Sequence, residues 1–276
     1  MTQILGYKRQ LVAYIDLLGF SEATSSQEDK TTILSLLKSL ASARSDFNIH
    51  VVEQTSNLIT TNTTPCVSTF SDNMIISYEL EKEDVAEINF HMSSLKRRLF
   101  MVALISLPMG FMIRGGITIG LLYHSQSESV VFGEALVEAH KLESAIAIYP
   151  RIVLSKAVSN LIPDYLDEQK QPIDLLGFKV KDFDGMYYLN YFKYEILEHF
   201  YPENPPASWK EDLSLWINNV QTIIQKNIDK YSQTESLAIL AKWEWFSLYF
   251  KSVISSKNKD ARPGFQSIQE VMGIIE

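Results

Sequence analysis

Two short apolar segments, each interrupted by one aspartate, constrain the fold of this chain most strongly. Asp16 lies within Ala13–Phe20 (AYIDLLGF), and Asp72 lies within Thr69–Tyr78 (TFSDNMIISY). Both segments have the apolar pattern of a β-strand. A buried carboxylate needs a cation or a shifted pKa, so two such aspartates on adjacent strands are suited to bind Mg²⁺ or Mn²⁺. Alternatively, Asp16 ends a strand before a helix and Asp72 begins a hairpin turn, as short acidic residues often do.

Four blocks of the sequence resemble motifs of the class III nucleotide cyclases and occur in the order found in that family. The first two are the aspartate segments; the others are Ile113–Leu122 (IRGGITIGLL) and Val131–Ser144 (VFGEALVEAHKLES). Together they cover about residues 9–195. The last block is most similar to the uridylate and cytidylate cyclases of Pycsar anti-phage systems. The resemblance implies conversion of UTP or CTP to cUMP or cCMP plus pyrophosphate, with two Mn²⁺ or Mg²⁺ ions per site.

The composition indicates a globular, cytoplasmic protein. Of the 276 residues, 46% are hydrophobic, and the net charge of −8 gives no general attraction to nucleic acid or to an anionic membrane. The single cysteine, Cys66, excludes an internal disulfide and fits a reducing compartment. The N-terminal residues lack the pattern of a signal peptide, and the longest apolar run, Leu99–Ile113, is too short to span a membrane.

Hydrophobic periodicity predicts an α+β fold, with helices packed on one mainly antiparallel sheet. That is also the element order of the class III cyclase catalytic domain. The expected helices are Asp29–Ala43, Asp84–Leu104, Gly133–Ala147 and Ser155–Leu161. The expected strands are Gln10–Leu17, Asn48–Gln54, Cys66–Phe70, Met74–Tyr78, Met112–Ile119, Ser129–Phe132, Arg151–Leu154 and Gly185–Tyr191, with a polar loop over Thr55–Thr64.

The segment Glu203–Ala207 (ENPPA) marks a boundary between a catalytic domain, residues 1–202, and a helical C-terminal extension, residues 203–276. Two helices are expected in the extension, beginning at capping boxes formed by Ser208 with Glu211 and by Ser232 with Glu235. The second helix is rich in aromatic residues. Packing against a domain or a second subunit is favoured for these residues over stacking on a nucleobase.

The resemblance to the cyclases implies roles for individual residues around the two aspartates. Asp16, Asp72 and the carbonyl of Leu17 would bind the metal ions. The backbone amides around Leu18, Gly19 and Phe20 would bind the triphosphate.

Three cationic residues are candidates for stabilising the phosphates. By spacing, Lys141 falls where the family has a transition-state arginine, although a solvent-exposed helix lysine is an equal alternative. Lys181, preferred narrowly over Lys179, falls where the family has a phosphate-binding lysine. Arg114 can reach a phosphate or the base, or can pair with a carboxylate.

The positions that read a purine base in the family are occupied by Ser68 and Val130, and Val137 replaces its transition-state asparagine. This pattern fits a pyrimidine substrate, and it also fits a domain that has lost catalysis. The retention of both aspartates argues against such a loss. The alternatives are an adenylate or guanylate cyclase, and a non-catalytic module for dimerisation or nucleotide binding.

The cyclase family forms its active site between two catalytic domains, so a single domain per chain implies a homodimer with two composite sites. Asp16 and Asp72 of one subunit would then face Val130–Lys141 of the other. The resemblance also implies a separate effector that is gated by the cyclic nucleotide.

Overall fold

The computed structural model of the chain describes residues 6–25, 30–46, 64–162, 165–166, 172–173, 179–192, 195–200 and 206–255. The strand expected over 48–54, and nearly all of the loop expected over 55–64, lie outside these residues. Within the described ranges, no helix is both long enough and apolar enough to cross a membrane.

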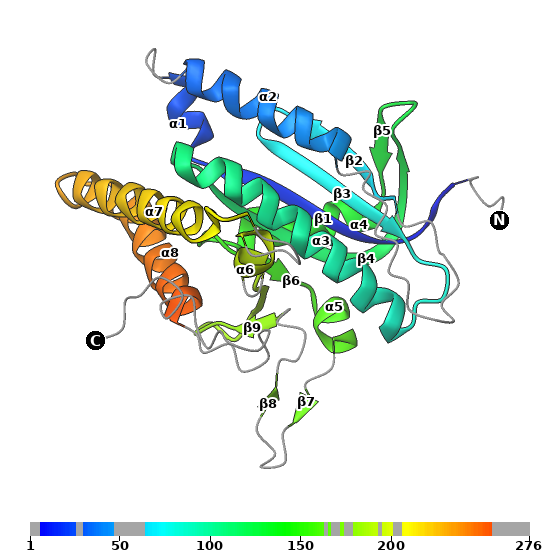
Figure 1. Ribbon diagram of the computed structural model, residues 1–276. Helices are drawn as coiled ribbons and strands as arrows, with labels where there is room; N and C mark the ends of the chain where they lie inside the picture. The colour runs from blue at the N-terminus through cyan, green and yellow to red at the C-terminus, as the bar shows by residue number, and fades with distance from the viewer. Residues whose placement is uncertain are drawn as a thin grey trace.

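One β-sheet forms the centre of the molecule, with the strand order β2-β3-β1-β4-β6-β10-β9, and with β5 paired to β4 (Figure 1). Among the described strands, all neighbours in this sheet are antiparallel except β4 and β6. The strands are β1 (Lys8–Leu18), β2 (Cys66–Phe70), β3 (Asn73–Glu79), β4 (Met112–Ser125), β5 (Val130–Phe132), β6 (Ile152–Leu154), β9 (Lys179–Lys181) and β10 (Tyr187–Leu189), with β7 (Tyr165–Leu166) and β8 (Pro172–Ile173) forming a separate pair. The predicted α+β class with a mainly antiparallel sheet is confirmed.

Helices cover both faces of this sheet. In Figure 1, α2 (Lys30–Asp46) and α3 (Val85–Ser106) lie side by side over β1–β3. On the other face, α4 (Glu134–Lys141) and the π-helical turn η2 (Leu142–Ile146) pack against β4 and β1. Alternate side chains of β1 point to opposite faces of the sheet. Val12 packs with α4, whereas the odd-numbered residues enter the main core: Leu11, Ala13, Ile15 and Leu17. The same alternation assigns Asp16 to the face that carries α4.

Several expected elements differ in extent from the prediction, and the strand expected over 185–191 is limited to β10 (Tyr187–Leu189). The helix expected over 133–147 is divided into α4 and η2, and the strand expected to end at Ile119 continues to Ser125. The remaining helices are α1 (Phe20–Ser25), η1 (Leu107–Met109), α5 (Lys156–Leu161), α6 (Glu195–Phe200), α7 (Trp209–Ser232) and α8 (Leu237–Ser255).

The helices α7 and α8 join the same apolar core as the sheet. The buried face of α7 includes Leu213, Ile217, Val220 and Ile224, as its periodicity predicts. The aromatic residues of α8 also pack inward, and the Tyr249 hydroxyl lies 2.8 Å from Oδ1 of Asn190. Packing is therefore confirmed for the aromatic residues that are buried in α8.

Both predicted capping boxes in the extension are wrong. Ser208 precedes α7, but its hydroxyl donates to the carboxylate of Asp212 and caps no backbone amide. Ser232 is the last residue of α7, and its hydroxyl donates to the carbonyl of Asp229. The helix α8 begins five residues later, at Leu237, because the chain first turns between the two helices.

Candidate functional site

Asp16 and Asp72 lie at the same corner of the sheet. Asp16 pairs with Asn73 in the register of β1 and β3, and Asp72 occupies the turn before β3. The Leu17 amide donates to the Asp72 carbonyl at 3.2 Å, and the Asn73 side-chain amide donates to the Asp72 carboxylate at 3.2 Å. The strand register and the bond from Leu17 place the second aspartate next to the first, and the bond from Asn73 holds its carboxylate within the turn.

Arg114 of β4 pairs directly with Asp16. The two residues are opposite each other in the β1–β4 register, and the Arg114 Nε lies 3.0 Å from the Asp16 Oδ2. The sequence analysis gives a phosphate, the base or a carboxylate as the partner of Arg114. In the structure Arg114 contacts a carboxylate. The ion pair is partly shielded from water, because the exposed fraction of the two side chains is 23% and 14%.

Glu143 is a third carboxylate at this site, and the sequence analysis did not identify it. Its Oε1 lies 2.6 Å from Nη2 of Arg114, and its side chain is only 5% exposed. The contact is an ion pair rather than a well-aligned hydrogen bond. Glu143 belongs to the sequence block that resembles a cyclase motif, but nothing in the helical periodicity of that block shows that the residue faces Arg114.

Close packing at Gly116 brings Glu143 to this position. A Cβ atom on Gly116 would lie 2.3 Å from the carbonyl oxygen of Ala139 and 2.5 Å from Cβ of Leu142. On the neighbouring residue, Gly115, it would lie 2.4 Å from the carbonyl oxygen of Tyr14. The Gly-Gly pair therefore lets α4, η2 and β1 approach the backbone of β4, which is the close approach expected from the sequence.

Burial and the positive charge of Arg114 shift the pKa values of Asp16 and Glu143 in opposite directions. Burial raises the pKa of the Asp16 carboxyl above its ordinary value, although the Arg114 guanidinium opposes this shift. The pKa of Glu143 is raised for the same reason and is opposed by the same guanidinium. The pKa of Tyr14 is raised by burial and then by the charges of Glu143, Asp16 and Asp72. These three carboxylates therefore share one electrostatic environment.

The turn after β1 lies beside this acidic group. Gly19 has a φ of +95°, a left-handed conformation that glycine adopts without strain, and α1 begins at the next residue. Leu18 and Phe20 on either side are buried and anchor the turn. The binding of a triphosphate by this turn stays a prediction.

A second cation near the site comes from the C-terminal extension. Lys242 of α8 is half-buried, and its pKa is lowered by burial and by the charge of Arg114, while Asp16 acts in the opposite direction. Lys242 in turn lowers the pKa of Asp16. No sequence pattern indicates this proximity, because the two residues belong to segments that are distant along the chain.

The other predicted site residues lie elsewhere in the chain. Ser68 is on β2, Val130 is exposed on β5 and Lys141 is exposed at the end of α4. Lys181 ends β9, which is four strand positions from β1, or about 19 Å at the usual strand spacing. Within one chain, therefore, Lys181 is not brought to Asp16, and the roles of these four residues stay predictions.

The donor groups at the corner fit a hard divalent cation. Two carboxylates and a backbone carbonyl are the oxygen ligands that Mg²⁺ and Mn²⁺ prefer, with water completing the coordination. Among the residues that the structure describes, no group of three or more His, Cys, Asp or Glu side chains could hold a metal ion. Any cation here would rely on the two aspartates, and it would compete with Arg114 for Asp16.

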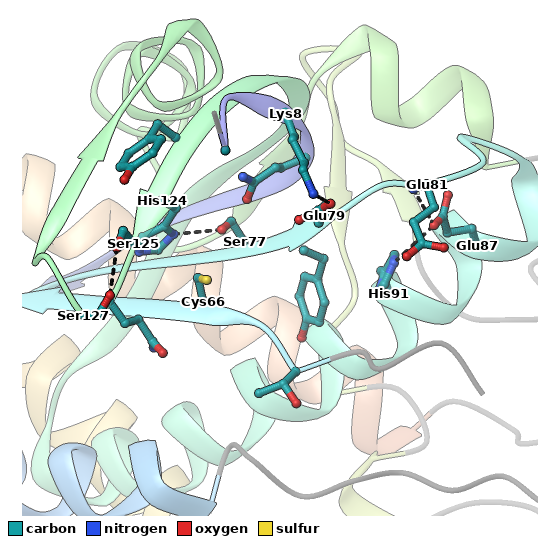
Figure 2. A pocket seen from close by; sticks show the side chains of 16 residues that line it. Lys8, Cys66, Ser77, Glu79, Glu81, Glu87, His91, His124, Ser125 and Ser127 are labelled. Atoms are coloured by element: carbon teal, nitrogen blue, oxygen red, sulfur yellow. Dashed lines mark hydrogen bonds and ion pairs between the residues drawn. The ribbon is translucent and has the colours of Figure 1, made fainter. Parts of the chain in front are cut away.

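A cavity of about 730 Å³ lies at the opposite end of β1, next to Lys8 and Gln10 (Figure 2). Its wall includes His124, whose ring nitrogens lie 2.8 Å from the hydroxyl oxygens of Ser68 and Ser77. Figure 2 shows the bond between His124 and Ser77 at this wall. The Ser68 hydroxyl is therefore held by a neighbouring side chain.

The comparisons with known proteins find similarity among solved structures but not among family models or curated proteins. No family model and no curated protein matches the sequence. A solved structure, that of the guanylyl cyclase Cya2, matches with a TM-score of 0.41 and 11% sequence identity, over 67% of this chain and 93% of that chain. A similarity of this size carries no argument about activity, so the functional inference rests on the sequence motifs and on the site.

Proposed function

We propose that this protein is a nucleotide cyclase of the class III type that converts UTP or CTP to the 3′,5′-cyclic monophosphate and pyrophosphate. The observation that carries the proposal is the placement of Asp16 and Asp72 at one corner of the sheet, beside Arg114 and the Gly19 turn. The two aspartates belong to the motifs that resemble those of the cyclases, and their adjacency agrees with a shared role as metal ligands.

In the proposed reaction, the ribose 3′-oxygen bonds to the α-phosphorus, the bond to the β-phosphate oxygen breaks, and the hydroxyl proton passes to solvent. Asp16, Asp72 and the Leu17 carbonyl would hold two Mg²⁺ or Mn²⁺ ions, which supply charge neutralisation and help to deprotonate the 3′-hydroxyl. Arg114 offers further N–H donors to the phosphates from its position next to Asp16. Leu18, Gly19 and Phe20 would orient the triphosphate through backbone amides.

A homodimer is proposed because the chain has one copy of each motif. Exposed apolar side chains support an interface: Phe70 of β2 is 84% exposed, and Val137 of α4 is 68% exposed. In such a dimer, Val130 and Lys141 of one subunit would face the aspartates of the other. Lys181 would also act across the interface, which is consistent with its distance from Asp16 within one chain.

A pyrimidine base is proposed because the purine-reading residues of the family are missing. Ser68 replaces a longer lysine or glutamate and is bonded to His124, and Val130 offers no polar group. With the Pycsar-like pattern of Val131–Ser144, this supports production of cUMP or cCMP as an antiviral second messenger that acts on a separate effector.

The decisive experiment is to incubate the purified protein with Mn²⁺ and ATP, GTP, CTP or UTP separately, and to identify the products by mass spectrometry. We expect a cyclic monophosphate from UTP or CTP that is lost in the Asp16→Ala variant. Turnover of ATP or GTP alone would contradict the pyrimidine assignment and support a purine cyclase.

A non-catalytic module is the second candidate, and one observation favours it. Arg114 compensates the charge of Asp16 directly, so this carboxylate has a partner within the protein and does not require a metal ion. Under this alternative, Asp72→Ala would leave the biological activity unchanged. Under the cyclase proposal, the same variant abolishes product formation, because Asp72 is one of only two proposed carboxylate ligands.

A further inference from the structure

Arg114 is shared by two carboxylates whose environments differ. Its Nε contacts Asp16 and its Nη2 contacts Glu143, so different nitrogens of one guanidinium serve the two partners. The Glu143 side chain is 5% exposed, whereas that of Asp16 is 14% exposed and lies next to the turn that contains Asp72. Asp16 is therefore the partner that a solute can reach, and Glu143 is the partner enclosed by protein.

The position of Glu143 is fixed by the backbone. Its turn η2 follows α4 directly, and the contacts of Gly116 with Ala139 and Leu142 hold both elements against β4. Arg114 is on β4 itself, two residues before Gly116. Because both members of the pair are attached to elements in close contact, their ion pair can persist when the bond from Arg114 to Asp16 is broken.

We propose that Glu143 is a positioning residue that retains Arg114 when a divalent cation takes Asp16. This inference rests on the metal site of the proposed function. The cation and the guanidinium compete for Oδ2 of Asp16, and the guanidinium has five N–H donors, so it can release Asp16 through Nε while Nη2 stays on Glu143. The displaced Nε–H then becomes available to the phosphates of the substrate.

Without the negative charge of Glu143, the replacement of Arg114 by a divalent cation at Asp16 becomes less favourable. Of its two carboxylate partners, Arg114 would then keep only Asp16. Breaking the contact with Asp16 would leave the half-buried guanidinium uncompensated next to an incoming divalent ion. The neutral side chain of glutamine keeps the shape of Glu143 and removes the charge. Metal binding therefore becomes weaker although no proposed metal ligand has been changed.

The test is the affinity of the full-length protein for Mn²⁺ without nucleotide, measured from the electron paramagnetic resonance signal of free Mn²⁺. We expect Glu143→Gln to weaken binding by about tenfold, in the range seen for residues that support metal ligands. The matched control is Glu138→Gln, because Glu138 lies five residues earlier, on α4, and bonds Thr118 instead of Arg114. This control should bind Mn²⁺ like the wild type.

The double variant Arg114→Met/Glu143→Gln separates a positioning role from a structural one. It has no arginine to displace, so we expect its affinity to return at least to that of the wild type. It also removes both charges of the Arg114–Glu143 ion pair together, so it should fold even where Glu143→Gln does not. Thermal unfolding in EDTA checks the folding of each variant.

Wild-type affinity in Glu143→Gln would overturn the inference, as would a double variant that binds as weakly as the single one. A wild-type protein that binds no Mn²⁺ would overturn the metal site of the proposed function, and this inference with it. Mn²⁺ binding by the wild type without cyclase activity would contradict the proposed reaction, whereas the affinities of Glu143→Gln and of the double variant would still support or overturn the role of Glu143.

Discussion

The Tyr231 hydroxyl lies 2.9 Å from each carboxylate oxygen of Glu22, although the two residues are 209 positions apart. Tyr231 is near the end of α7, and Glu22 is in the first turn of α1, directly after Gly19. Lys230 adds an ion pair of 3.4 Å to the same carboxylate. The C-terminal extension is thus bonded to the segment that follows β1, and it also brings Lys242 into the electrostatic environment of Asp16.

Tyr231→Phe should loosen this connection. The variant keeps the ring and removes the hydroxyl, so we expect a loss of about 1 kcal/mol in the free energy of unfolding, since Glu22 is half exposed and solvent screens the bond. Urea unfolding of the wild type, Tyr231→Phe, Glu22→Gln and the double variant measures the coupling. Strictly additive effects of the two substitutions would contradict the bond.

Gly116→Ala should separate α4 and η2 from β4. The added Cβ would overlap the Ala139 carbonyl at 2.3 Å, so the backbone has to move, at about 1–3 kcal/mol of stability. The movement also takes Glu143 away from Arg114. Gly120→Ala is the control, because its Cβ would meet only atoms of Ala135 in the described structure, the nearest being the Ala135 Cβ at a milder 3.2 Å. Equal stability losses in both variants, measured by urea unfolding, would contradict this account.

The strand position of Asp16 and the turn position of Asp72 were predictable because they depend on local rules, whereas the pairing of β1 with β3 that makes them adjacent joins segments distant in the chain. Strand periodicity sets the face of Asp16, and a short hairpin brings Asp72 to the end of the neighbouring strand. The hairpin over 66–70 and 73–79 and the long helix of α3 follow from the same kind of pattern. The metal and nucleotide roles of these residues come from the resemblance to cyclases and stay predictions.

The ion pair of Arg114 with Glu143 was not predictable, because it depends on packing between elements. It requires the close contact at Gly116 and a π-helical turn in a segment whose sequence fits an ordinary helix. The position of Lys181 depends on the order of strands across the sheet, which no single strand encodes. The contacts of Tyr231 and Lys242 join distant segments, and no repeat or spacing signals them.

The stability of the protein should fall on mild acidification because of His91. Burial lowers the pKa of His91, and Glu87 opposes this only in part, so the folded state binds a proton less readily than the unfolded state. Between the lowered pKa and the ordinary value of about 6.5, the unfolded state carries more protons, and the free energy of unfolding therefore decreases as the pH falls below about 6.5.

The pKa of His199 is lowered in the same direction, because its ring is partly desolvated beside Phe100 and Phe200 although the residue as a whole is exposed. Urea unfolding at several pH values between about 7 and 5 should show the decrease, and His91→Gln should make the profile shallower. A second substitution, His199→Gln, should flatten it further. An unchanged slope in the double variant would show that other groups control the acid response.

Lys242→Met should strengthen the binding of Mn²⁺ at the proposed metal site. The half-buried ammonium adds positive charge near Asp16, so its removal lowers the repulsion of an incoming cation, and we expect affinity to rise by roughly threefold or more. The control is Lys251→Met, because Lys251 is exposed on the same helix and its loss removes the same charge at a different position. If both variants strengthen binding equally, the effect is one of overall charge, and α8 has no specific influence on the acidic corner. If only Lys242→Met does so, the extension contributes directly to the electrostatics of the site.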